Sequence, residues 1–152
     1  MKTYRLVSLA APLLTFALAG PSAAQNQVYD SANPALAALT TDNLLATNSP
    51  VLGNPGYTIE VQGLPPAAFV ILDMATGPAD IPLPGFGALL INPAGLFAIR
   101  TTVSQPFPGG TAFFFFPIPN NPALLGVSVY TQCATFAGPT LALTWGLQTT
   151  IF

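Results

Sequence analysis

Short apolar runs, separated by clusters of proline and glycine, form the dominant pattern of this chain from residue 44 onward. Residues 57–63 alternate strictly between apolar and polar side chains. A period of two places the two sets on opposite faces of a β-strand, one buried and one in water. Residues 67–74 are apolar on both faces until Asp73, which is typical of a central strand.

Extending this reasoning along the chain predicts about eight or nine short strands. The windows are residues 44–47, 57–63, 67–74, 86–92, 97–103, 111–117, 126–136, 140–144 and 147–152. Regularly spaced turns around short strands favour an all-β fold, here a single antiparallel β-sandwich of jelly-roll or Ig-like type. Helix is expected only as a turn or two after Asn33-Pro34 and as one turn after Asn121-Pro122, where Asn can cap and Pro can begin a helix.

The first 24 residues have the three-part layout of a secretory signal peptide. Lys2 and Arg5 precede an apolar run over residues 6–20, and the small residues 22–24 follow. The run falls short of the ~20 residues that a membrane-spanning helix needs. We therefore expect cleavage after Ala24 and a secreted protein, extracellular or on the cell surface, with the periplasm as an alternative. The remaining chain divides into an N-terminal segment, residues 25–43, and a β-sandwich domain, residues 44–152.

Few charged groups remain once this leader is removed. Arg100 is then the only basic residue against five acidic ones, and the chain contains no histidine. Counterion-driven binding to nucleic acid needs many basic side chains, so it is not expected, and no transmembrane segment follows the leader. Serine hydrolase chemistry lacks its histidine. Cys133 is the only cysteine, which precludes an intrachain disulfide and predicts a small buried side chain.

Three carboxylates are the remaining candidates for acid–base chemistry. Asp73 and Asp80 would flank one loop, and Glu60 lies in a predicted strand. A glycosidase needs two carboxyl groups at a defined separation, whereas aspartates in turns commonly bond to their own backbone. No Asp-rich loop with calcium-ligand spacing occurs. We interpret the three as solvated or structural groups and expect no enzyme activity, no metal and no cofactor.

Aromatic side chains are the remaining source of specificity. Phe113 to Phe116 would point alternately to the two faces of a strand, so they form core unless one face is left open as an association surface. Trp145, in a predicted turn, either packs over the sheet end or stacks against a sugar. The residues we assign to a ligand or association surface are Trp145, Tyr57, Tyr130, Phe114 and Phe116.

The stretch from Leu44 to Ile151 resembles an uncharacterised C-terminal module that recurs in secreted bacterial proteins. The resemblance rests on Pro50-Val-Leu-Gly53, on Leu64-Pro65-Pro66-Ala67, on the segment Ile118-Pro-Asn-Asn-Pro-Ala-Leu-Leu-Gly126 and on Tyr130-Thr-Gln132. In that module an Asn commonly occupies the position of Trp145. The resemblance implies a compact β-sandwich and no known activity.

Together these features predict a secreted, non-enzymatic structural, surface or adhesion module that self-associates into a homo-oligomer through apolar faces. The alternative is a carbohydrate-binding module that holds a glycan on exposed aromatic rings.

Overall fold

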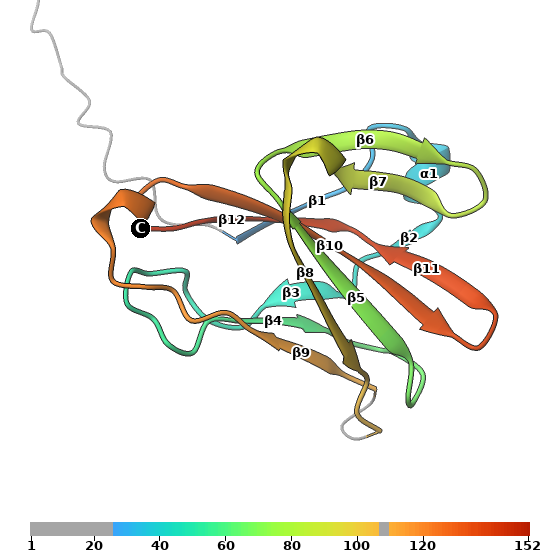
Figure 1. Ribbon diagram of the computed structural model, residues 1–152. Helices are drawn as coiled ribbons and strands as arrows, with labels where there is room; N and C mark the ends of the chain where they lie inside the picture. The colour runs from blue at the N-terminus through green and yellow to red at the C-terminus, as the bar shows by residue number, and fades with distance from the viewer. Residues whose placement is uncertain (1–25, 107–109) are drawn as a thin grey trace, which may run out of the picture.

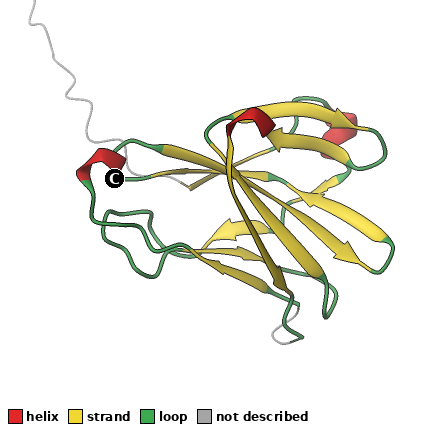
Figure 2. Ribbon diagram, viewed as in Figure 1, coloured by secondary structure: helices red, strands yellow, loops and turns green. Residues whose placement is uncertain are grey.

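A computed structural model describes residues 26–106 and 110–152 of the chain, and the expected signal peptide lies outside them. The described residues form twelve strands, one short α-helix and two 3-10 turns (Figures 1 and 2). In chain order they are β1 (Asn26–Tyr29), α1 (Pro34–Ala37), β2 (Thr40–Thr41), β3 (Leu44–Ala46), β4 (Thr58–Val61), β5 (Phe69–Ala75), β6 (Pro78–Leu83), β7 (Gly87–Ile91), η1 (Pro93–Gly95), β8 (Leu96–Val103), β9 (Ala112–Phe115), η2 (Pro122–Leu124), β10 (Ser128–Ala137), β11 (Thr140–Thr144) and β12 (Gly146–Thr150).

The strands make three sheets arranged in layers. Seven strands, β1, β2, β5, β8, β10, β11 and β12, form a large curled sheet in the middle of Figure 1. The three-stranded sheet β3-β4-β9 faces one side of it, and the β6–β7 hairpin lies over the other side. The main core therefore lies between the large and the three-stranded sheet.

Alternation along the strands builds this core. Ile59 and Val61 of β4 and Phe114 of β9 point from the small sheet toward Val70 and Leu72 of β5, and all five are at most 5% exposed. Full burial of each such side chain contributes roughly 1.5–3 kcal/mol by transfer bookkeeping. The opposite face of β9 is open, because Phe115 is 69% exposed. The Phe113–Phe116 run thus has one covered and one uncovered face.

Strand β10 is the centre of the large sheet. Along one edge it pairs with β5, and along the other it pairs first with β12 and then with β11. Strand β10 pairs Ala134 with Leu143 of β11 and Thr131 with Leu147 of β12. Three steps along β10 therefore correspond to four steps along the β11–β12 segment. The extra residue is Trp145, which forms a β-bulge between β11 and β12. Beyond the bulge, β11 pairs with β2 in parallel and β12 pairs with β1 in antiparallel orientation.

A buried glutamine attaches the β6–β7 hairpin to the large sheet. The Gln132 side chain, 2% exposed, accepts a hydrogen bond from Leu90 N (2.8 Å) and donates to Ala88 O and Thr144 O, both at 2.9 Å. The Tyr29 hydroxyl donates to Leu90 O at 2.8 Å. Two side chains of the large sheet therefore bond β7 much as a neighbouring strand would.

The expectation of an all-β fold is confirmed, but the number of strands and sheets differs from the prediction. Each of the nine predicted windows contains a strand, and β1, β2 and β6 are additional. Strand β6 contains Pro78 and Pro82, which the sequence pattern treats as strand breakers. It tolerates both because β7 is its one partner among the described strands, so half of its backbone groups need no partner strand. The predicted helical turns are present at α1, capped by Asn33, and at η2, capped by Asn121.

Candidate functional site

The five aromatic residues assigned to a surface do not come together on one face. Tyr57 and Phe114 are 3% and 5% exposed and lie in the core, so neither ring offers a face to a ligand at the surface. Phe116 is half-buried at the end of the same core. Tyr130 is half-buried in β10, edge-on to Tyr29 with ring centroids 6.1 Å apart.

Trp145 is half-buried at the bulge. Its backbone N donates to Thr41 O at 2.7 Å, which ties the bulge to β2. The indole Nε1 is buried and has no hydrogen-bond partner among the described residues. The neighbouring Gly146 is required there, because a Cβ at that position would overlap the Tyr29 ring. The geometry is that of a packed corner of the sheet.

The candidate carboxylates also lie apart, in three different sheets. Asp80 of β6 accepts hydrogen bonds from Ser31 Oγ (2.7 Å) and Ala32 N (3.0 Å), and so fixes the chain before α1. Glu60 accepts a bond from Gln62 Nε2. Asp73 lies in β5, where partial burial raises its pKa. Within residues 26–106 and 110–152, no cluster of three or more His, Cys, Asp or Glu side chains is placed to hold a metal ion.

Arg100 and Cys133 occupy structural positions. Arg100 pairs with Leu72, one step along from the Asp73↔Ile99 pair, so alternation places Arg100 and Asp73 on opposite faces of the sheet. Cys133 is fully buried in the core, and burial raises the pKa of its thiol well above the usual value, with the Asp73 carboxylate adding to the effect. A buried, protonated thiol is a poor nucleophile.

Two other features of the structure are candidate binding sites, and neither is evident from the candidate residues taken one at a time. The first is a set of exposed apolar residues on the outer face of the large sheet, which we call the outer apolar face. Phe136, Phe69 and Val103 lie side by side across β10, β5 and β8, and the two Phe rings are 6.3 Å apart. Alternation along β8 adds Ile99 to the same face, and the exposed Phe97 follows at a β-bulge in the pairing with β5. The exposed fractions are 38% for Phe136, 43% for Phe69, 52% for Val103 and 56% for Ile99 and Phe97.

The outer apolar face ends at an unpaired strand edge. Among the described strands, β8 pairs only with β5, which leaves its other edge without a ladder partner. Strand β8 is eight residues long, contains no proline and carries one charge, at Arg100. Natural sheets usually protect such an edge with prolines, bulges or several charges. Strand β8 has one bulge, at Phe97 against β5, and residues 98–103 pair with β5 in regular register. An apolar surface beside a bare edge is typical of an association site.

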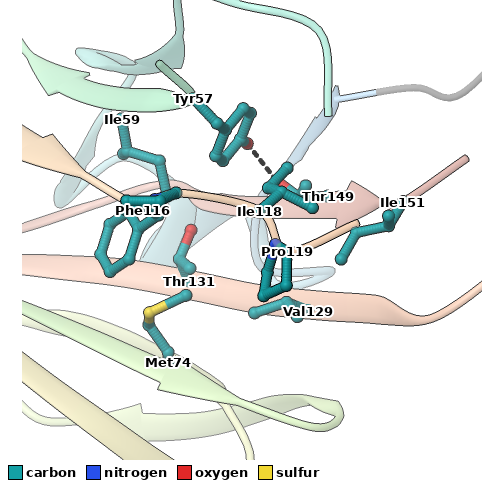
Figure 3. A pocket seen from close by; sticks show the side chains of 11 residues that line it. Tyr57, Ile59, Met74, Phe116, Ile118, Pro119, Val129, Thr131, Thr149 and Ile151 are labelled. Carbon is teal, nitrogen blue, oxygen red and sulfur yellow. Dashed lines mark hydrogen bonds between the residues drawn. The ribbon is translucent and has the colours of Figure 1, made fainter. Parts of the chain in front are cut away.

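The second feature is a cavity of about 130 Å³ at one end of the core, between the two facing sheets (Figure 3). Its walls come from β4, β5, β10, β12 and the segment that follows β9. The lining residues are Tyr57, Ile59, Met74, Phe116, Pro117, Ile118, Pro119, Val129, Thr131, Thr149 and Ile151. Pro117 and Pro119 are exposed, so the cavity reaches the surface along that segment.

The side-chain hydroxyls around the cavity are already hydrogen-bonded to protein atoms. The Tyr57 hydroxyl lies 2.6 Å from Thr149 Oγ1 and donates to Asn26 Oδ1 at 2.9 Å. Thr131 Oγ1 donates to Leu147 O. Burial raises the pKa of Tyr57 to about 12, although the bond with Thr149 acts in the opposite direction. The hydroxyl is therefore neutral at ordinary pH, and the wall is uncharged.

Comparison with protein-family models, with curated proteins and with solved structures gives no match for this chain. No helix in the described part of the chain is long and apolar enough to span a membrane. The functional argument therefore depends on the geometry of the outer apolar face, the β8 edge and the cavity.

Proposed function

We propose that this protein is a secreted, non-enzymatic β-sandwich module that associates with copies of itself through the outer apolar face and the free edge of β8. The proposal rests on the observation that the outer apolar face and the free edge occur on the same strand. The exposed Ile99 and Val103 side chains belong to β8, whose second edge is unpaired among the described strands. Export is proposed on the pattern of residues 1–24. Membership of the uncharacterised secreted bacterial module is proposed on the motifs quoted above.

A second copy of the same strand fits this edge. Two β8 strands related by a twofold axis pair in antiparallel orientation, and residues of the same face lie opposite one another. The register that sets Ile99 opposite Ile99 of the second copy places Arg100 opposite Ala98. In the neighbouring register, Arg100 would lie opposite Arg100 of the second copy, and the repulsion between the two like charges disfavours that arrangement. The register with Ile99 opposite Ile99 also extends the outer apolar face across both copies.

Sedimentation velocity of the purified protein over a range of concentrations tests this function. We expect a dimer or larger species that Ile99→Lys converts to monomer, because the substitution puts a charge at the centre of the contact. The matched control is Ile81→Lys, since Ile81 is 40% exposed but lies in β6, away from β8. A protein that stays monomeric at high concentration would overturn the proposal, as would assembly that survives Ile99→Lys unchanged.

A further inference from the structure

We infer that the cavity between the two sheets is a binding site for a small, uncharged hydrocarbon group about the size of one aromatic ring. This inference concerns a different surface from the proposed self-association and does not depend on it.

The size of the cavity sets the class of ligand. At about 130 Å³ it is close to the engineered apolar cavities of about 150 Å³ that take up benzene. It cannot enclose a disaccharide or a drug-sized molecule, since sites for drug-sized ligands span roughly 300–1,000 Å³. A single ring or an alkyl group of similar volume fills it.

The chemistry of the walls excludes polar guests. Ile59, Ile118 and Ile151 are at most 9% exposed, and the hydroxyls of Tyr57, Thr131 and Thr149 are bonded to protein atoms. A water or a sugar hydroxyl inside would find few free partners, and a buried water normally makes about three hydrogen bonds. An apolar guest loses nothing by entering and gains contact with the lining side chains.

The walls are also largely preformed. Phe116 N donates to Tyr57 O at 2.9 Å and Ile118 N donates to Asn54 O at 2.8 Å, so the segment after β9 is held against the chain that leads into β4. Pro117 and Pro119 fix two further backbone angles in this segment. A rigid cavity does not collapse when it is empty, and little ordering cost opposes binding.

Benzene is the probe, with phenol as the polar comparison. We expect benzene to raise the midpoint of thermal unfolding, with the folded-to-unfolded ratio increasing about tenfold at ten times its dissociation constant. We also expect intermolecular nuclear Overhauser effects from benzene to the methyl groups of Val129 and Ile151. Phenol should bind at least about tenfold more weakly, because its hydroxyl is desolvated without a partner.

Val129→Phe fills the cavity, and Val28→Phe is the matched control, since Val28 is 40% exposed on β1. The filled variant should lose the stabilisation by benzene, and the control should keep it. If Val129→Phe does not fold, the Overhauser contacts in the unaltered protein decide the question. Contacts confined to Ile99 and Val103 would overturn the inference. So would the absence of stabilisation, equal stabilisation of the filled variant, or phenol binding as tightly as benzene.

Discussion

Replacing Gln132 by Leu tests how the β6–β7 hairpin is held to the large sheet. Leucine has a similar volume but no amide, so the substitution removes the three hydrogen bonds to Leu90 N, Ala88 O and Thr144 O. All three residues are fully buried, so water cannot replace the lost partner. Each buried group left without a partner costs about 1–3 kcal/mol, and carbonyls lie at the lower end because they hold a second lone pair.

The added apolar burial of Leu offsets part of this cost. We therefore expect the free energy of unfolding to fall by about 2–5 kcal/mol, a large share of the 5–15 kcal/mol that is typical of a domain. Urea unfolding followed by tryptophan fluorescence measures the change. Hydrogen exchange should show that the amide of Leu90 loses most of its protection.

Gln148→Leu is the matched control for this prediction. Gln148 is half-buried in β12, and within the described part of the chain its side-chain amide makes one hydrogen bond, to Ser128 Oγ at 3.4 Å. Its replacement should cost less than about 1 kcal/mol, since the lost bond is long and water can reach the site. Equal losses for the two variants, or a Gln132→Leu protein as stable as the original, would refute the reasoning.

Three further predictions concern polar side chains that are wholly or partly buried. Trp145→Phe should leave the free energy of unfolding, measured with urea, within about 1 kcal/mol of the original. The loss of buried ring area is offset because the substitution removes a buried N–H that has no partner among the described residues. A loss above about 3 kcal/mol would show that the indole N–H has a hydrogen-bond acceptor after all. Burial raises the pKa of Tyr57 to about 12, that of Tyr29 further, and that of the Cys133 thiol well above its usual value, so the neutral form of each group favours the fold. Stability should therefore fall as pH rises above about 9, where the unfolded thiol ionises, and more steeply above about 10, where the unfolded tyrosines ionise. Unchanged urea midpoints from about pH 8 to 11.5 would contradict this. Partial burial raises the pKa of Asp73, so its ionised form opposes folding. Asp73→Asn should therefore raise the free energy of unfolding, measured with urea, at pH 7 but not at pH 3. Equal changes at the two pH values would contradict this explanation.

Sequence pattern predicted the strands that have local signals. Residues 57–63 alternate and residues 67–74 are continuously apolar, and both windows contain core strands. Strand β1 carries no such signal, because Asn26 and Gln27 are polar and only Val28 and Tyr29 suggest a strand. It forms because β12 offers an edge, and that edge is more than a hundred residues away in the sequence.

The candidate sites were predicted only in part for a related reason. Alternation in the Phe113–Phe116 run correctly indicates that Phe114 and Phe115 face opposite ways, but it does not say which face is covered. The cavity is lined by segments scattered from Tyr57 to Ile151, so no local motif marks it. Likewise, the exposed side chains of β8 become one surface with Phe69 and Phe136 only through strand pairing.

The pairing of β1 with β12 has a consequence for the order in which the chain folds. The Thr149 hydroxyl lies 3.0 Å from Asn26 Oδ1 across 123 residues of sequence, and the Thr41 hydroxyl donates to Leu143 O across 102. Contacts this remote carry a large loop-closure entropy and place a β-protein among slow folders, with times of milliseconds to seconds. The large sheet is completed only when both ends of the described chain are present. A chain in which β1 and β2 have not docked exposes the outer edges of β12 and β11 to mispairing.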